Sequence, residues 1–311
     1  MIVTLTPNPS LDRTIEIAEL RRGEVHRATG GRVDPGGKGV NVSRALAAGD
    51  TATVAVLPSG GPEGAQLAKL LEPFGVQTVQ VPIVGTVRSN ITVAEPDGTT
   101  TKLNEAGPEI TADECAAIER TVVELAANAS WFVGSGSLPR GVGDDFYARL
   151  VTALRDHDIK VCIDASGPPL AAAVDAGPDL IKPNAEELAE LVGRPLRRLA
   201  DVVEAAAEVR KRGVATVLVS LGGDGALLVS ADEVLHGWAP PVKVRSTVAA
   251  GDSTLAGYLA AGGRGRQALV TAIAYGTAAV QLPGSVMPRP TDLHPDAVEV
   301  TDNPDLDRTL A

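Results

Sequence analysis

Thr247-Val-Ala-Ala-Gly-Asp-Ser-Thr-Leu-Ala-Gly257 joins an alternating, strand-like segment to a helix rich in small residues. The alternation in Val242-Lys-Val-Arg-Ser-Thr247 predicts a strand, and the pattern that follows predicts a helix over about 252–261. Unpaired backbone donors and the positive end of a helix dipole together form an anion-binding site. We expect one here because three small residues leave the N–H groups at the helix start uncovered: Ala249, Ala250 and Gly251.

Asp252 lies inside the positive region that this junction creates. A carboxylate beside an anion site can take the proton of a hydroxyl while the site stabilises a transferring phosphoryl group. The alternative is that Asp252 only caps the helix. Within this stretch alone capping is the simpler interpretation, so the choice depends on the rest of the chain.

The composition excludes several classes of partner. The chain has 311 residues, 44% of them hydrophobic, which suits one large α/β domain or two smaller ones. Its formal net charge is −11, and no lysine and arginine cluster is long enough to follow a nucleic acid or an anionic membrane. Cys115 and Cys162 alone make neither a disulfide framework nor a zinc motif. The start, Met1–Pro7, lacks a signal-peptide pattern, and no apolar stretch is long enough to span a membrane, which predicts a cytoplasmic protein.

Strand and helix patterns alternate along most of the chain. Helix patterns occur at 62–74, 111–128, 144–158, 202–211 and 267–281, and Thr111-Ala-Asp-Glu114 has the sequence of a capping box. We expect roughly eight core strands in one mostly parallel sheet, from the strand patterns at 2–7, 51–58, 76–83, 131–137, 160–165, 179–184, 216–221, 226–230, 234–238 and 242–247. The predicted fold is a three-layer α/β sandwich in a single domain, 1–311. The last 25 or so residues, rich in proline and aspartate, read as a surface tail.

Two polar segments depart from this alternation. Residues 13–35 read as edge strands of a small sheet. Arg88–Glu95 and Thr99–Asn104, joined by the turn Pro96-Asp-Gly98, have the pattern of a hairpin. We therefore expect a four-stranded β lid inserted from about 9–35 and 86–105.

A glycine loop, Asp34-Pro-Gly-Gly-Lys-Gly-Val-Asn-Val42, opens a helix. Its glycines would let backbone approach a ligand closely, although an ordinary glycine-rich turn remains the alternative. The spacing is neither that of a Walker loop nor that of a dinucleotide fingerprint. A second loop, Gly134-Ser-Gly-Ser-Leu-Pro139, carries proline where such a fingerprint has its last glycine, which argues against a nicotinamide cofactor.

Further along, Asp179-Leu-Ile-Lys-Pro-Asn184 leads into a helix that carries Glu186 and Glu187. Asn184 and Glu187 are three residues apart, so both can face one site, although a helix cap followed by a first-turn acid explains them equally simply. Near the end, Ala274-Tyr-Gly-Thr-Ala-Ala279 gives the helix over 267–281 a small-residue face suited to close packing or to a flat ring.

Together these motifs resemble the ribokinase-type (PfkB) carbohydrate kinase family. The resemblance runs from Thr4-Leu-Thr-Pro-Asn-Pro-Ser-Leu-Asp12 to Gly276-Thr-Ala278, and its motifs keep the family's order. The N-terminal motif, the glycine loop and Arg88-Ser-Asn-Ile-Thr-Val93 are similar to the branch that acts on phosphorylated ketohexoses, including 1-phosphofructokinase and tagatose-6-phosphate kinase. The resemblance implies transfer of phosphate from ATP, with Mg²⁺, to a sugar hydroxyl.

The resemblance also implies a role for each matching residue. Asp252 would be the base, with the backbone of Ala249, Ala250 and Gly251 as the anion hole. Sugar hydroxyls would bind Asp12, Gly36, Gly37 and Asn41, and the existing phosphate would bind Lys38, Arg88, Ser89 and Arg27. Asn184 and Glu187 would act on Mg²⁺ through water. The nucleotide would contact Lys182, Ser220, Gly222, Gly225 and Ala278.

The main departure from the family is Ala249, where a glycine is usual. If this residue has a positive φ, alanine costs about 1–2 kcal/mol of strain, whereas in an ordinary conformation the change is nearly silent. A distorted hole would leave a sugar-phosphate-binding regulator, but such a sensor has no need of Asp252. A Rossmann oxidoreductase fits the alternation but lacks the fingerprint.

We therefore expect an ATP-dependent phosphosugar kinase that converts fructose 1-phosphate to fructose 1,6-bisphosphate. The alternatives are a tagatose-6-phosphate kinase or a 6-phosphofructokinase. A homodimer that pairs through the lid is a further expectation.

Overall fold

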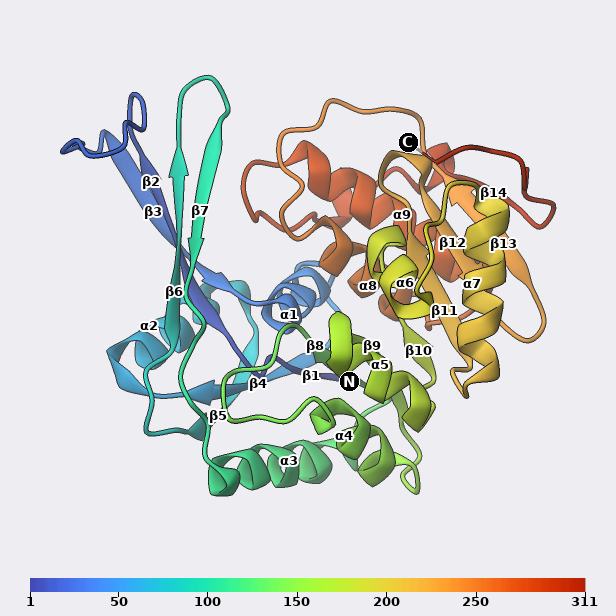
Figure 1. Cartoon of the computed structure of the whole chain (residues 1–311), viewed down its shortest axis with the longest axis horizontal. Helices are drawn as coiled ribbons and strands as arrows, with labels where there is room; N and C mark the ends of the chain where they lie inside the picture. The colour runs from blue at the N-terminus through green and yellow to red at the C-terminus, as the bar shows by residue number, and fades with distance from the viewer. Residues whose placement is uncertain (311) are drawn as a thin grey trace.

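The computed structural model describes residues 1–310, which form one large and one small β-sheet (Figure 1). The large sheet has ten strands in the order β14-β13-β12-β11-β10-β9-β8-β1-β4-β5. From β11 to β5 all neighbours are parallel, and β12, β13 and β14 continue the sheet in antiparallel fashion. The strands are β1 (Ile2–Leu5), β4 (Thr53–Ser59), β5 (Gln77–Pro82), β8 (Trp131–Ser135), β9 (Lys160–Asp164), β10 (Leu180–Ile181), β11 (Thr216–Ser220), β12 (Ala226–Val229), β13 (Val234–Trp238) and β14 (Glu299–Thr301).

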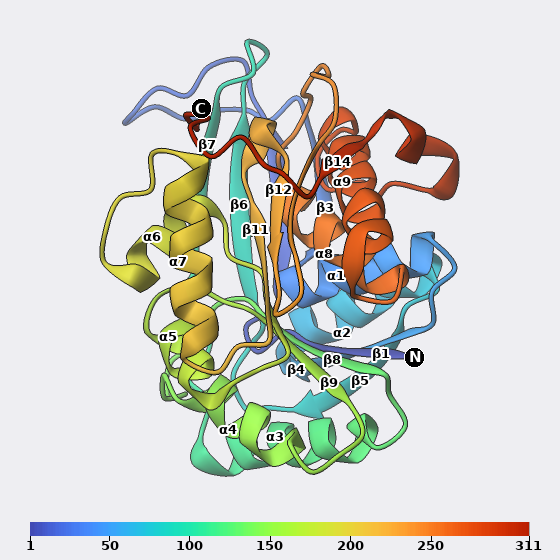
Figure 2. The same ribbon diagram turned by 90° about the vertical axis from the view of Figure 1, so that its right-hand side faces the viewer.

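Helices cover both faces of this sheet, as Figure 2 shows. Strand side chains alternate between the faces, so Val3 and Leu5 pack into one core cluster and Ile2 into the other. The first face carries α3 (Ala112–Ala126), α4 (Phe146–Leu154), α5 (Gly167–Ala176), α6 (Ala185–Val192) and α7 (Leu199–Lys211). The second carries α1 (Lys38–Ala48), α2 (Gly61–Leu71), α8 (Ala250–Ala260) and α9 (Gly265–Gln281). No helix within residues 1–310 is long and apolar enough to cross a membrane.

The small sheet is the lid, and it stands apart on the left of Figure 1. Its order is β3-β2-β6-β7, with β2 and β6 parallel and the other pairs antiparallel. It contains β2 (Ser10–Glu16), β3 (Gly30–Gly36), β6 (Arg88–Ala94) and β7 (Thr100–Asn104). Because β2 follows β1 and β6 follows β5, the lid rises from the carboxyl ends of the parallel strands, where such sheets bind ligands.

The register of the lid separates a polar face from an apolar one. Asp12 pairs with Asp34 and with Asn90, and Asn90 pairs with Asn104, so these four side chains share a face. The opposite face is largely apolar: its row contains Leu11, Ile15, Ile91, Val93 and Leu103. Leu11 is buried in a core cluster with α2, which fixes the base of the lid against the body.

The strand expected at 242–247 does not form. Its alternating sequence is present, but the backbone N–H groups of Arg245 and Ser246 both turn to the carbonyl of Val280 at the end of α9. The place beside β13 that such a strand would take is occupied instead by β14, from the segment that we expected to be a surface tail. Nine of the strand patterns form strands of the large sheet and β14 is the tenth, where roughly eight core strands were expected.

The rest of the C-terminal segment contacts α7 and the loop after β11. The N–H of Leu199 donates to the carbonyl of Arg308, and that of Ala200 donates to the carbonyl of Leu306. The guanidinium of Arg308 donates to the buried carboxylate of Asp224 at 2.7 Å. The segment thus completes the N-terminus of α7 and holds the loop 222–225 in place.

Candidate active site

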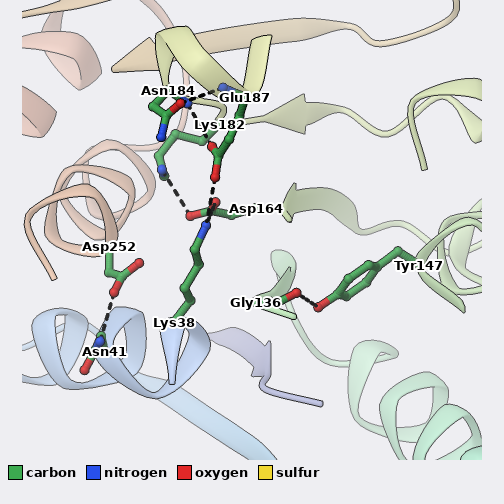
Figure 3. A network of polar contacts seen from close by, with 9 residues as sticks. All are labelled: Lys38, Asn41, Gly136, Tyr147, Asp164, Lys182, Asn184, Glu187 and Asp252. Atoms are coloured by element: carbon green, nitrogen blue, oxygen red, sulfur yellow. Dashed lines mark hydrogen bonds and ion pairs between the residues drawn. The ribbon is translucent and has the colours of Figure 1, made fainter. Parts of the chain in front are cut away.

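Asp164 joins three elements at the carboxyl edge of the sheet (Figure 3). It ends β9 and is 1% exposed, and its Oδ1 accepts a hydrogen bond from Lys38 Nζ at 2.9 Å. Its Oδ2 lies 3.1 Å from Nζ of Lys182, which follows β10 and is itself buried. Lys38, the first residue of α1, also lies 3.6 Å from Glu187 on α6. These contacts fix two cations at one edge of the sheet.

The charges in this cluster stabilise one another. Burial alone would raise the pKa of Asp164, but the ammonium groups of Lys182 and Lys38 hold it below its usual range. Burial opposes the charge of Lys38, yet Asp164 and Glu187 raise the pKa of this lysine above its usual value. Asp164 and Lys38 are therefore both ionised at neutral pH, and Lys38 presents positive charge to the site.

Asp252 lies beside this cluster as the third residue of α8. Its Oδ2 accepts a hydrogen bond from Nδ2 of Asn41 on α1 at 2.9 Å, so the carboxylate reaches across to another helix. The helix N-cap is Ala249, not Asp252. Burial, then the negative charge of Asp164, raises the pKa of Asp252 to about 6, against the opposing effects of Asn41, Lys182 and Lys38. A buried carboxylate with such a pKa is ionised at pH 7 and can accept a proton.

The N-terminus of α8 offers donors next to this carboxylate. Within residues 1–310 no acceptor takes the backbone N–H of Gly251 or of Asp252. A Cβ placed on Gly251 would lie 3.3 Å from Lys182 Nζ, so the lysine ammonium sits against the same turn. Free N–H groups, the helix dipole and a lysine together can bind an anionic group at this turn.

Ala249, at this turn, adopts a left-handed conformation, with φ 61° and ψ 11°. An L-residue other than glycine, asparagine or aspartate is strained there, because its Cβ approaches the neighbouring carbonyl. The anion hole keeps its helical geometry from Ala250 onward. The alanine therefore lowers stability without abolishing the turn.

Replacing Ala249 with glycine tests this strain directly. We expect Ala249→Gly to raise the free energy of unfolding by about 1 kcal/mol, because glycine adopts positive φ without a Cβ clash. Denaturant unfolding measures the change. The matched control is Ala250→Gly, one residue inside the helix, which should lower stability by about 0.5–1 kcal/mol. A loss of stability in both variants would contradict the inference that Ala249 is strained.

Asp12 occupies the polar face of the lid above the glycine loop. Its Oδ1 accepts hydrogen bonds from Ser10 Oγ at 2.8 Å and from Asn90 Nδ2 at 3.0 Å. A Cβ on Gly36 would lie 2.3 Å from Asp12 Oδ2, so only glycine leaves room for this carboxylate. The next residue, Gly37, has φ 119° as the N-cap of α1, which again requires glycine.

Arg88 anchors the lid to the body. Its Nη1 donates to the carbonyl of Glu105 at 2.9 Å and its Nη2 to that of Asn8 at 3.0 Å. Its Nε is buried and has no partner within residues 1–310, and burial lowers the pKa of the guanidinium despite Asp12 and Glu105 nearby. A guanidinium stays protonated in proteins, so Arg88 places a positive charge on the face of Asp12 and Asn90. Its Nε is an unused donor.

Two of the expected phosphate ligands lie elsewhere. The side chain of Ser89 is on the opposite lid face, because consecutive strand residues alternate, and it meets Arg13 at 3.4 Å. Arg27 lies in the exposed connection between β2 and β3 and contacts no charged partner among the described residues. Lys38, as described above, faces Asp164 and Glu187.

Asn184 and Glu187 form a capping box at the start of α6. Asn184 Oδ1 accepts from the Glu187 N–H at 2.7 Å, and Glu187 Oε2 accepts from the Asn184 N–H at 2.9 Å. These two residues therefore cap the helix, as the simpler interpretation of the sequence predicted. Glu187 Oε1, which faces Lys38, is left to accept from water, and Asn184 Nδ2 is left to donate to water or to a phosphate oxygen.

The residues expected to bind the nucleotide lie at the end of β11, in the loop after it and on α9. Ser220 ends β11 and bridges to Asn184, and a Cβ on Gly222 would meet open space. Gly225 is different, since its Cβ would lie 2.0 Å from the carbonyl of Gly237, which makes it a packing glycine. Ala278 on α9 lines a cleft of about 150 Å³, together with Ala274, Thr277, Asp292 and His294.

Sequence reasoning missed three residues of this site. Asp164 was predicted only as part of a buried strand, although an acidic residue at the end of such a strand indicates a candidate site residue. Asn90 was included in the motif 88–93 without a role of its own, and it supports Asp12. Arg44, on α1, donates to Asn41 Oδ1 at 3.3 Å and so contacts the residue that holds Asp252.

The fold and site are those expected of a phosphotransferase: a buried carboxylate beside unpaired helix N–H groups, fixed lysines at the edge of an α/β sheet, and a small β-sheet beside them. The chain belongs to the pfkB family of carbohydrate kinases, whose model matches residues 6–292. It is an ATP-dependent sugar kinase, and kinases of this family use ATP with Mg²⁺.

Named relatives agree with this assignment. The chain is 41% identical over 264 residues to the 1-phosphofructokinase of Haloferax volcanii, covering 84% of each protein. It is 36% identical over 257 residues to the 1-phosphofructokinase of Vibrio cholerae serotype O1, covering 82% of this chain and 81% of that one. The crystal structure of phosphofructokinase-2 from Escherichia coli in complex with potassium has a TM-score of 0.89 at 34% identity, covering 94% of this chain and 96% of that one.

Proposed function

We propose that this kinase transfers the γ-phosphoryl group of ATP to the C6 hydroxyl of fructose 1-phosphate, giving fructose 1,6-bisphosphate and ADP. The observation that carries the proposal is the buried carboxylate of Asp252, held by Asn41 next to the unpaired N–H groups of α8. The likeness to 1-phosphofructokinases supports the choice of substrate.

The phosphoryl transfer needs a general base, an anion hole and fixed positive charges. The hydroxyl oxygen attacks the γ-phosphorus while the bond to the bridging oxygen of ADP breaks, and the hydroxyl proton passes to Asp252. Charge on the phosphoryl oxygens is stabilised by the N–H groups of Gly251 and Asp252 and by Lys182. Because these donors are already in place, they do not have to reorganise during the reaction.

The residues around Glu187 fit Mg²⁺ bound with ATP. Within residues 1–310 no cluster of three acidic, histidine or cysteine side chains could hold a metal by itself. Magnesium usually keeps several waters and binds through one or two carboxylates plus substrate phosphates. The partly exposed carboxylate of Glu187, with Asn184 beside it, matches this requirement. When bound, Mg²⁺ neutralises the charge of the β- and γ-phosphates. We infer that Ser220, Gly222 and the cleft at Ala278 receive the nucleotide.

The lid supplies the contacts to the sugar. A ketohexose furanose carries two hydroxymethyl arms on roughly opposite sides of its ring, so holding a phosphate on one arm delivers the other to Asp252. The guanidinium of Arg88, on the same lid face as Asn90, suits the phosphate, and Asp12, Asn90 and Asn41 suit the ring hydroxyls. An epimer that leaves one of these buried groups unpaired would be rejected strongly.

The deciding experiment is a comparison of kcat/KM at saturating ATP and Mg²⁺. The substrates are fructose 1-phosphate, fructose 6-phosphate and tagatose 6-phosphate. A coupled assay of ADP release measures the turnover of each. We expect fructose 1-phosphate to be used most efficiently. A tenfold preference for tagatose 6-phosphate would assign that substrate instead, and turnover of none would favour a sugar-phosphate sensor. A preference for fructose 6-phosphate would agree with the likeness to phosphofructokinase-2 of Escherichia coli.

Arg88→Ala tests the phosphate contact. A charge-assisted hydrogen bond contributes about 1.5–3 kcal/mol, so binding of fructose 1-phosphate should weaken about 10- to 100-fold. Binding of unphosphorylated fructose should change much less, and calorimetry measures both. The control is Arg27→Ala in the exposed connection between β2 and β3, with little expected effect on either ligand. An equal loss for both sugars in Arg88→Ala would place this arginine outside the phosphate site.

We also infer that two copies pair through the lid. The apolar lid face presents Ile15, Ile91 and Val93 half-buried, and Leu103 57% exposed, beyond the part that packs on α2. Such a contiguous apolar sheet face is costly to leave in water.

The proposed substrates, ATP and a sugar phosphate, support a cytoplasmic location.

Adjacent residues on opposite lid faces make a matched test of this dimer. Light scattering should show Val93→Asp as a monomer of 31.9 kDa and wild type at twice that mass. Thr92→Asp, one residue away on the polar face, should remain dimeric. A monomeric wild type would remove the proposal.

A further inference from the structure

A second pocket, of about 340 Å³, lies where α1, β3, the 3₁₀ turn Glu72–Phe74 and the segment 283–289 meet. Three arginines line it, Arg32, Arg44 and Arg289, with one acid, Asp34. These four residues carry a formal charge of +2, in a chain whose net charge is −11. The rest of the lining is mainly apolar and includes Pro73, Phe74, Pro283, Val286 and Met287.

Arg44 is the buried member of this group, and its charge lacks a direct partner. It is 3% exposed and forms no ion pair with any residue from 1 to 310. Its Nη1 makes three long hydrogen bonds of 3.3–3.4 Å, to Asn41 Oδ1, the carbonyl of Pro35 and Ser285 Oγ. Its Nε is buried and unpartnered within the described chain. The carboxylates of Asp34 and Asp12 lie near enough to favour its charge, but neither forms an ion pair with it. A buried guanidinium without a direct ion-pair partner is costly, so this site is suited to an anion.

The other arginines stand at the rim. Arg32 is paired with Asp34 at 2.8 Å, and its guanidinium lies against Gly284, so it bridges the lid and the segment 283–289. Arg289 is exposed and forms no ion pair in the part of the chain described. Arginine matches phosphate geometry through its planar fork of donors, and two or three around one pocket favour a doubly charged anion.

We propose that this pocket binds a phosphate monoester, with its phosphate between Arg44 and Arg289 and its organic part against the apolar lining. The ring of Phe74, already 4.6 Å from the Arg44 guanidinium carbon, offers a flat apolar wall. The lining of the pocket shares no residue with the proposed sugar site, although Asp34 lies beside Asp12 on the same lid face. The two sites share one connection: Arg44 holds Asn41 Oδ1, while Asn41 Nδ2 holds Asp252.

Titration calorimetry on the whole protein tests the site, with phenyl phosphate and inorganic phosphate as probes. We expect phenyl phosphate to bind and Arg289→Gln to weaken it about tenfold, as loss of a charge-assisted contact implies. Arg44→Lys keeps the charge but loses the fork, and should weaken binding at least as much. Arg120→Gln, an exposed arginine on α3, is the charge-matched control and should change affinity less than about twofold. Thermal unfolding of each variant checks that it is folded.

Arg88→Ala separates this pocket from the sugar site. Under the proposal it leaves phenyl phosphate binding at the pocket intact. Loss of binding in Arg88→Ala with none in Arg289→Gln would place the probe in the sugar site and overturn the proposal. So would the absence of binding in wild type, or binding that neither arginine affects. If inorganic phosphate binds as tightly as phenyl phosphate and both depend on Arg289, the site stands and its ligand is free phosphate.

Discussion

Asp252→Asn should lower kcat by about 10²–10⁴-fold, the usual contribution of a general base. The substituted amide still accepts the hydrogen bond of Asn41 and fills the same volume, so the anion hole should keep its shape. Binding of ATP and sugar phosphate should therefore change little. Steady-state turnover and calorimetry measure the two effects separately. Activity within about threefold of wild type would remove Asp252 from the mechanism.

The same residue predicts a dependence on pH. Because the pKa of Asp252 is about 6, kcat of the wild-type enzyme should fall as pH decreases through 6, when the base becomes protonated. Stability has the opposite sign: the folded protein binds this proton more tightly than the unfolded chain, so ionisation destabilises the fold as pH rises through 6. The shift corresponds to about 3 kcal/mol, and Asp252→Asn should recover part of it at pH 8. Asp144→Asn, on an exposed loop, is the control.

Asp164→Asn should be the most destabilising single change in the site. It removes the counter-charge of Lys182, which is buried, and of Lys38, and leaving buried charges unpaired costs about 3–5 kcal/mol. Denaturant unfolding measures the loss. Asp175→Asn, whose side chain is 65% exposed in a surface pair with Arg212, should cost far less.

A second readout distinguishes this network from simple loss of packing. The negative charge of Asp164 is one cause of the raised pKa of Asp252, and Asn removes it while leaving both lysines. The acid limb of kcat against pH should therefore move below 6 in Asp164→Asn. An unshifted limb in the folded variant would show that the two carboxylates are not coupled.

The parts of the site that depend on local sequence could be predicted. Small residues before a helix predict the helix start with uncovered N–H groups at Ala249–Asp252. The spacing of Asn184 and Glu187 predicts that they share one helix turn. The lid also followed from its hairpin and its polar strands. Each of these signals lies within a few consecutive residues.

Features that depend on distant partners could not be predicted. Asp164 matters because it meets Lys38, which is 126 residues away in sequence, and no local pattern records that contact. The segment 242–247 has the alternation of a strand, but β14 already occupies the edge beside β13. Ala249 was recognised as a departure, yet its φ of 61° depends on how the chain enters α8.

The C-terminal segment links two parts of the chain that are far apart in sequence. Arg308 holds Asp224 in the loop proposed to face the nucleotide, and residues 306–308 complete the start of α7. Local fraying of this segment would free the loop 222–225 and the first turn of α7, while the lid and Asp252 keep their own contacts. Such fraying should therefore weaken the proposed nucleotide contacts before it affects the proposed sugar contacts.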